Sequence, residues 1–171
     1  GMGGHEAGEV ASAAAVAAFS SLIGLSSVHA GDVVEALDEA RGSVDALATG
    51  TRGGAGTTLS GVLVSQQNGD GYWLVVNLGD SRTYRFADGA LEQISVDHSV
   101  VQELIDAGQM TIEDAASAAD RNVITRALGA GSDAERLGGV GVDLAHRFGV
   151  LLDQARDSPS LGARQVLADH P

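Results

Sequence analysis

The sequence predicts an α+β fold in which two helices precede a run of antiparallel strands, with shorter helical pieces after them. Alanine-rich, helix-forming residues occupy Glu6 to Leu25, and a second helical pattern runs from Asp32 to Ala48. Residues 57–94 then hold β-branched and aromatic runs separated by turn signals. A chain of 171 residues with 44% hydrophobic content is large enough for one domain with a sizeable core.

The two predicted helices differ in how they would pack. Small residues such as Ala11 and Ala15 let the first helix approach a neighbour closely, whereas Val33, Leu37 and Val44 give the second helix an apolar face. The glycine-rich stretch that follows resembles a phosphate cradle, but neither a lysine nor a helix start comes after it. We therefore expect residues 50–56 to be a connecting loop.

The strand region contains two hairpin signals, Asn68-Gly69 and Asp88-Gly89. The expected strands are Thr57–Ser65, Tyr72–Gly79, Arg82–Phe86 and Ala90–Ile94, joined into one antiparallel meander of four strands. The second of these is rich in aromatic and β-branched residues, which is typical of a strand covered on both faces.

At the end of that strand, Gly79 loosens the backbone and Asp80 follows at the surface. A carboxylate in this place can be a hard oxygen ligand for Mg²⁺ or Mn²⁺. The alternative, which spacing alone favours, is a turn capped by Asp80 and Ser81 with Arg82 as its partner.

Helical signals return after the strands. Asp97-His98-Ser99 begins a helix with Ser99 or Asp97 as its cap, and Gly108 ends it. Thr111 with Asp114 indicates a second capped start. Asp97 and His98 are open to two interpretations. They could belong to a metal site, but residue type alone favours a helix cap beside a solvated histidine.

Composition excludes several classes of function. The net charge is −13 and every basic residue is an arginine, so the surface repels nucleic acid and anionic membranes. The absence of cysteine excludes disulfides, zinc-thiolate sites and a cysteine nucleophile, and it is compatible with the cytoplasm. The apolar stretch from Val10 to Leu25 is too rich in alanine and serine to span a membrane. We therefore expect a cytoplasmic protein with neither nucleic-acid nor membrane partners.

Short blocks in a fixed order give the chain a family resemblance. They are Gly1-Met2-Gly3-Gly4-His5 with Ala7-Gly8-Glu9-Val10-Ala11-Ser12, Gly56-Thr57-Thr58-Leu59, Asn77-Leu78-Gly79-Asp80-Ser81-Arg82, Asp97-His98-Ser99, and Arg121-Asn122-Val123-Ile124-Thr125-Arg126-Ala127-Leu128-Gly129. In these blocks the chain resembles the bacterial branch of the metal-dependent serine/threonine protein phosphatases of type 2C (the PPM family). The resemblance implies a partial PP2C-like β-sandwich, with antiparallel sheets flanked by helices. It also implies hydrolysis of phosphoserine and phosphothreonine in phosphorylated proteins, with a cognate serine/threonine kinase as a candidate partner.

The resemblance also implies the site. An intact family member holds two or three Mg²⁺ or Mn²⁺ ions, and the matching metal ligands here are the carbonyl of Gly1 and the carboxylate of Asp80. In the family an aspartate precedes this glycine. Because the chain opens at Gly1, we expect a fragment cut at its amino end. His5 is either a proton donor to the leaving alkoxide or a structural histidine, and the structural role is favoured. No catalytic side chain and no organic cofactor site is assigned.

The carboxyl end departs from the family after Gly129. Residues 1–130 are predicted to form the PP2C-like domain portion, and residues 131–171 a divergent carboxyl segment of the same domain. The family's Ser-Asp-Gly and Asp-Asn ligand patterns do not occur there. A shifted reading frame and natural divergence are both open explanations. Gln165–Ala168 resembles a helix that follows in the family, and Asn122–Leu128 resembles the exit of the family's flap beside the active site.

Missing ligands lead to a further prediction. A two-metal site without its bridging aspartate cannot hold both ions, so the isolated chain should be inactive or weaker by several orders of magnitude. The alternative from another class is an inactive, phosphatase-like module that binds a partner protein, or an incomplete fragment.

Overall fold

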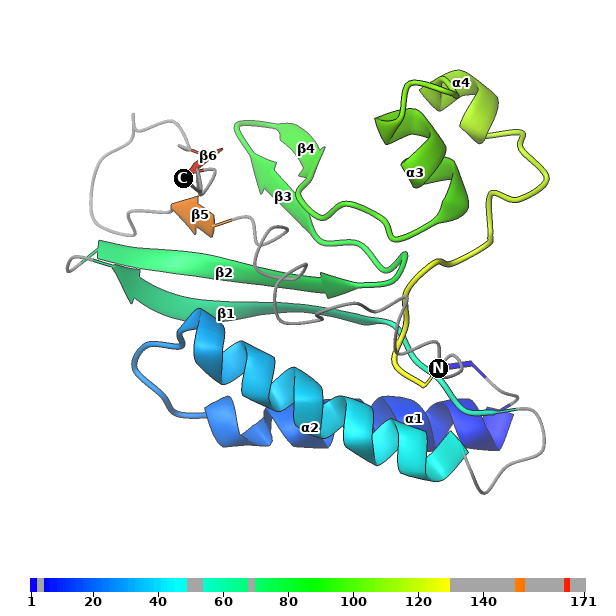
Figure 1. Cartoon of the computed structure of the whole chain (residues 1–171). Coiled ribbons are helices and arrows are strands. Elements are labelled where there is room, and N and C mark those ends of the chain that lie inside the picture. The colour runs from blue at the N-terminus through cyan, green and yellow to red at the C-terminus, as the bar shows by residue number, and fades with distance from the viewer. Residues whose placement is uncertain (3–4, 49–53, 68–69, 130–149, 153–164, 167–171) are drawn as a thin grey trace.

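The structure is a computed structural model that describes residues 1–2, 5–48, 54–67, 70–129, 150–152 and 165–166. A layer of two helices lies against one face of a sheet, while a second hairpin and two short helices lie on the other side of it (Figure 1). This is the α+β arrangement of helices and antiparallel sheets that the sequence predicts.

The helical layer is formed by α1 (His5–Ala18), a 3-10 turn η1 (Phe19–Leu22) and α2 (Ala30–Ala48). The small side chains of Ala11 and Ala15 are buried beside Ala40 and Val44 of α2, which brings the two helices close together. Both predicted helices are thus confirmed, although the α-helical part of the first ends at Ala18 rather than at Leu25.

The main sheet is built on a hairpin of β1 (Leu59–Gln67) and β2 (Asp70–Leu78), with Leu59 opposite Leu78. The strand β5 (Val150–Leu152) pairs with the other edge of β2, and β6 (Gln165–Val166) pairs with β5. All pairs are antiparallel, in the order β1-β2-β5-β6. The helix expected to begin at Gln165 is therefore wrong for its first two residues, since backbone pairing with β5 makes them a strand.

The core lies between this sheet and α2. Leu74 and Val76 of β2 are buried against Val33 and Leu37, the apolar residues that the sequence assigns to one face of the helix. Burying one such side chain contributes roughly 1.5–3 kcal/mol. From Leu74 to Leu78 every residue of β2 is buried, as expected for a strand covered on both faces, whereas Trp73 is exposed.

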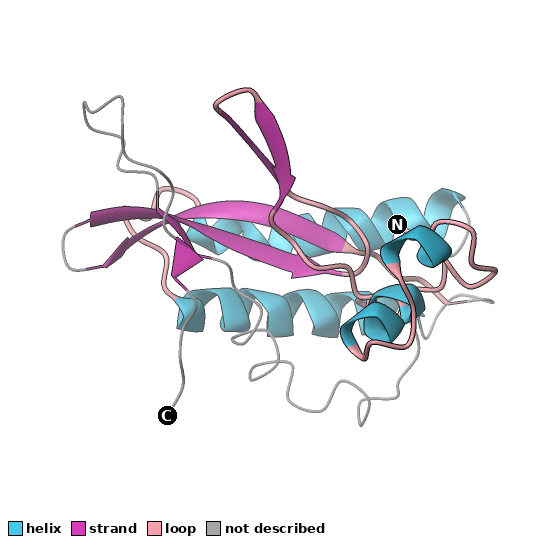
Figure 2. Cartoon of the chain, turned by 90° about the horizontal axis from the view of Figure 1, so that it is seen from above, coloured by secondary structure: helices cyan, strands magenta, loops and turns pink. Residues whose placement is uncertain are grey.

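The second hairpin corrects the predicted meander. The strands β3 (Tyr84–Ala87) and β4 (Ala90–Gln93) form a separate two-stranded sheet (Figure 2). Asp88 and Gly89 both have positive φ, 52° and 78°, which is the backbone of the tight turn that an Asp-Gly pair predicts. The hairpin is confirmed, but the single meander is wrong, because the chain turns away after β2 and β5 occupies the edge of β2.

Residues 97–128, called the flap here, leave the end of the sheet and return to it. They contain α3 (Val100–Asp106) and α4 (Ile112–Ala115), capped by the side chains of Ser99 and Thr111 as expected. Antiparallel bridges join Ser99 to Ile124 and Thr57 to Leu128, so the predicted exit segment does return to the core. None of the helices in the described parts of the chain is long and apolar enough to cross a bilayer.

Candidate metal-binding site

Several segments meet at the end of the sheet where β2 stops. Met2 and Gly56 exchange backbone hydrogen bonds of 2.6 and 3.1 Å, and the next residue, Thr57, exchanges bonds of 2.9 Å with Leu128. The following residue, Thr58, lies against Gly79. The short segment 56–58 therefore brings the two predicted ligand positions, Gly1 and Asp80, to the same end of the molecule (Figure 1).

The backbone of Gly1 crosses the first turns of α1 at Gly8. A Cβ atom on either glycine would collide with the backbone of the other, so this approach requires two residues without side chains. The crossing fixes the Gly1 backbone beside the helix. Gly3 and Gly4 lie outside the described residues, as does the side chain of His5, the residue at which α1 begins.

Asp80 follows a glycine whose backbone conformation other residues rarely adopt. Gly79 has φ of 100°, and a Cβ atom there would collide with the side chain of Thr58. Asp80 itself is half-buried. A 2.7 Å hydrogen bond between the hydroxyl groups of Ser81 and Thr58 fastens the turn to the residue that precedes β1.

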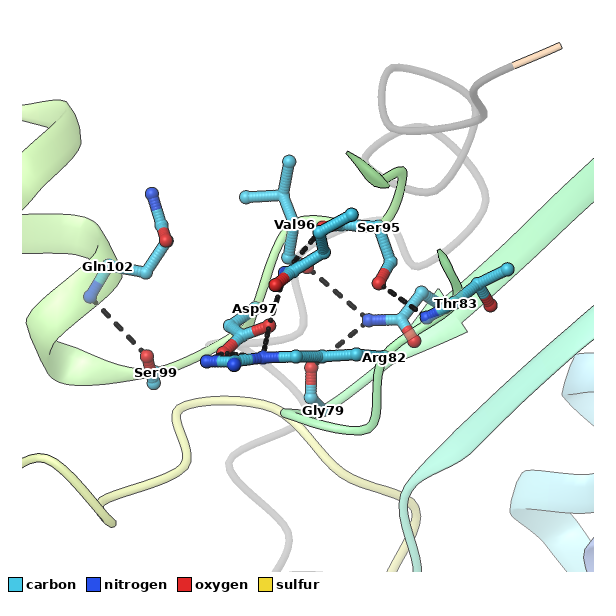
Figure 3. A network of polar contacts seen from close by, with 10 residues as sticks. Gly79, Arg82, Thr83, Ser95, Val96, Asp97, Ser99 and Gln102 are labelled. Atoms are coloured by element: carbon cyan, nitrogen blue, oxygen red, sulfur yellow. Dashed lines mark hydrogen bonds and ion pairs between the residues drawn. The ribbon is translucent and has the colours of Figure 1, made fainter. Parts of the chain in front are cut away.

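Arg82 forms an ion pair with Asp97 (Figure 3). The turn interpretation made Arg82 the partner of the Asp80–Ser81 turn, and that part of it is wrong. The Nε of Arg82 donates to both carboxylate oxygens at 2.9 Å, and Nη2 donates to Oδ2. Gln93 donates to Oδ1 at 3.0 Å. Because the charged acceptor stabilises the guanidinium, Asp97 raises the pKa of Arg82. The pair ties the turn to the start of the flap.

His98 is also placed differently from the favoured prediction. It is only 2% exposed, so the solvated histidine is wrong. Its backbone N–H donates to the carbonyl of Gly79 at 2.9 Å, and its Nδ1 accepts from the N–H of Gly79 at 3.1 Å. The start of the flap is packed on the Asp80 turn, which removes His98 and Asp97 from water. The cap of α3 is Ser99 alone.

The sequence does not predict the contacts of Arg82 with Asp97 and of Gly79 with His98. These residues are 15 and 19 positions apart, too far for the residue spacing of a helix or a strand to indicate a contact. One signal was available. Asp97, His98 and Ser99 are three consecutive polar residues before an apolar stripe, and a helix needs only one of them as its cap.

The donors present agree with a hard cation in type, though not in number. A backbone carbonyl and a carboxylate supply the oxygen atoms that Mg²⁺ and Mn²⁺ prefer. Within the described ranges, however, no group of three or more histidine, aspartate or glutamate side chains converges to hold a metal ion. Gly1 and Asp80 could therefore form only part of a coordination shell.

Comparison with known proteins identifies the family. A scan of protein-family models finds no match. The chain is 42% identical over 134 residues to the serine/threonine protein phosphatase PstP of Mycobacterium tuberculosis, which covers 75% of this chain and 25% of PstP. It is 33% identical over 138 residues to the serine/threonine phosphatase stp of Listeria monocytogenes, covering 75% of this chain and 53% of the relative.

Solved structures give the same result. The crystal structure of the M. tuberculosis phosphatase PstP/Ppp matches with a TM-score of 0.65 and 36% identity, over 74% of this chain and 54% of the other. The PstP catalytic domain in complex with two manganese ions matches with a TM-score of 0.61 and 29% identity, over 96% and 58%.

The α+β arrangement of helices and antiparallel sheets is the class of fold that these solved phosphatase structures share with the chain. The chain belongs to the PPM (type 2C) family of serine/threonine phosphatases. It spans 25% of the length of PstP and 53% of the length of the Listeria relative.

Proposed function

We propose that the chain is part of a protein serine/threonine phosphatase that uses Mg²⁺ or Mn²⁺ to hydrolyse phosphate monoesters on phosphorylated proteins. The observation that carries the proposal is the agreement of sequence and fold with PstP, at 42% identity and a TM-score of 0.65. The manganese in a matching PstP structure supports the choice of metal.

In the proposed reaction, a water oxygen forms a bond to phosphorus while the bond from phosphorus to the serine or threonine oxygen breaks. The leaving alkoxide takes up a proton. Divalent cations, when bound, lower the pKa of water and neutralise charge on the transferred group. The contribution of this chain is to present the Gly1 carbonyl and the Asp80 carboxylate as oxygen ligands from a fixed sheet end.

Several finer points belong to the same proposal. Residues 131–171 would continue the domain of residues 1–130, and further ligands would lie outside the described residues. The protein would act on phosphoproteins in the cytoplasm, a compartment with which its lack of cysteine is compatible. A serine/threonine kinase acting on the same proteins would be the partner.

A graft tests the proposal. Residues 1–129 would replace the matching segment of the PstP catalytic domain, and release of phosphate from a phosphothreonine peptide would be measured against Mn²⁺ concentration. We expect turnover that a chelator abolishes and that Asp80→Asn lowers sharply. Asp88→Asn is the matched control, because this carboxylate lies in the exposed β3–β4 turn at a φ that asparagine tolerates.

A folded graft that binds Mn²⁺ and releases no phosphate would contradict the proposed activity. A folded graft that does not bind the metal would indicate the alternative, a phosphatase-like module that binds a partner protein.

A further inference from the structure

The two hydrogen bonds between His98 and Gly79 reach both peptide groups that flank Gly79. The N–H of Gly79 belongs to the peptide that precedes it, and its carbonyl belongs to the peptide shared with Asp80. The first is held by Nδ1 of His98 at 3.1 Å and the second by the His98 backbone N–H at 2.9 Å. Fixing both peptides fixes φ and ψ of Gly79, and therefore the direction in which the chain continues to Asp80.

This restraint acts where the backbone is least restricted. A glycine at φ of 100° has neighbouring conformations that other residues do not share, so the strand end cannot by itself hold Asp80 in one direction. Asn77 adds a bond from its Nδ2 to the same carbonyl at 3.2 Å. Without His98, the preceding peptide would lose the acceptor of its N–H.

A second fastening lies on the other side of Asp80. Arg82 is held by Asp97, the residue immediately before His98 (Figure 3). Asp80 therefore sits between two anchored positions, Gly79 and Arg82, and both anchors come from adjacent residues at the start of the flap. Asp97 and His98 are buried, at 6% and 2% exposure, whereas the Arg82 side chain is 48% exposed, so the bonds between His98 and Gly79 are the better sheltered from water.

We propose that His98 is a positioning residue for Asp80: its side-chain acceptor, Nδ1, fixes the Gly79 peptide and so directs the Asp80 carboxylate toward a divalent cation. The start of the flap and the orientation of this ligand are thereby coupled. The inference rests on the proposed function, because it takes Asp80 to be a metal ligand. Removing a group that orients a metal ligand without touching the metal commonly lowers metal affinity by about 10–100-fold.

Two amide substitutions separate the hydrogen bond from the volume of the ring. In His98→Asn, Oδ1 stands the same number of bonds from the backbone as Nδ1 and can accept from Gly79. In His98→Gln, the acceptor is moved one bond outward, to the place of Nε2. His98→Leu removes the acceptor altogether. Ser99→Ala is the control, because it removes a buried cap of α3 and has no bond to the Asp80 turn.

The measurements are made by NMR on the 171-residue chain. Without metal, hydrogen exchange of the Gly79 amide reports its bond to His98. With Mn²⁺ alone as the probe, paramagnetic broadening of the Asp80 amide reports binding at the carboxylate. We expect His98→Gln and His98→Leu to speed Gly79 exchange about tenfold and to weaken Mn²⁺ broadening by about tenfold. His98→Asn should stay within about twofold of the parent chain in both measurements, and Ser99→Ala should change neither.

The outcomes distinguish a failure of the positioning role of His98 from a failure of the metal assignment of Asp80. If His98→Gln loses Gly79 protection and keeps its Mn²⁺ response, the positioning role is wrong and the proposed metal site stands. If His98→Asn is as impaired as His98→Leu, the hydrogen bond is not the cause and the role is again wrong. If Mn²⁺ does not broaden Asp80 in the parent chain, the metal assignment fails, and the positioning role fails with it. Should His98→Leu not fold, the comparison of His98→Asn with His98→Gln decides the result.

Discussion

The helix-covered face of the sheet and the end of the same sheet are held together by different forces. On the face, Val33 and Leu37 of α2 pack against Leu74 and Val76 of β2 in one apolar cluster. At the end, Gly79 and Arg82 are fastened to the flap by hydrogen bonds and an ion pair. Apolar packing tolerates adjustment, whereas a hydrogen-bonded turn holds one backbone direction. The first region supplies stability and the second supplies geometry.

The largest expected effect belongs to the apolar face. Leu37 is 1% exposed, so Leu37→Ala should leave a cavity and lower the free energy of unfolding by about 2–5 kcal/mol. Urea unfolding followed by circular dichroism measures this. An exposed leucine, Leu91, provides the control, and Leu91→Ala should change stability by less than about 0.5 kcal/mol. Equal losses from the two substitutions would contradict the placement of the core.

Gly79→Ala tests the end of the sheet at a position where an added Cβ atom has no room. The added Cβ meets Thr58 at a positive φ, so stability should fall by about 2–4 kcal/mol. Gly89→Ala is matched, because Gly89 also has positive φ, 78°, but has open space around it. Gly89→Ala should lower stability only by the cost of placing alanine at a positive φ, about 1 kcal/mol. Similar losses at both glycines would show that contact with Thr58 is unimportant.

Two arginine ion pairs, one with a buried carboxylate and one with an exposed carboxylate, should differ less in their contribution to stability. Arg82→Met leaves the carboxylate of Asp97, whose side chain is 8% exposed, without its cation, and should cost about 1–3 kcal/mol. Arg85→Met breaks a pair with Glu92, whose side chain is 62% exposed, and should cost less than about 1 kcal/mol. Thermal melts at low and high salt measure both. Equal costs would mean that the Arg82 pair is an ordinary surface contact.

The same contrast explains what the sequence could predict. Helix-forming composition located the first long helix, apolar periodicity located the second, and Asp88-Gly89 located the second hairpin, because these signals are local. The joining of the two hairpins into one meander failed. A strand pattern shows that a segment is extended but not which strand it pairs with, and β5 reaches β2 from far along the chain.

The candidate site was only partly predictable, for a related reason. Family resemblance pointed to Gly1 and Asp80, and the structure brings both to the same end of the sheet. The burial of His98 and the partner of Arg82 could not be read from the sequence, because each depends on the flap folding back onto the turn. Residue type alone favoured solvent for that histidine.

The central claim is that the Asp80 carboxylate is a metal ligand on a turn that other residues hold in place. The most direct test is a thermal melt of the graft of residues 1–129 into the PstP catalytic domain and of its Asp80→Ala variant, each recorded across a range of Mn²⁺ concentrations. Our account predicts that Asp80→Ala melts at the parent temperature or slightly above it without metal, since Gly79 and Arg82 still fasten the turn. It also predicts that the rise in melting temperature with Mn²⁺, which binding to the folded state produces, is lost. A variant destabilised by about 1 kcal/mol, as for a lost cap, with an unaltered Mn²⁺ dependence would contradict the claim.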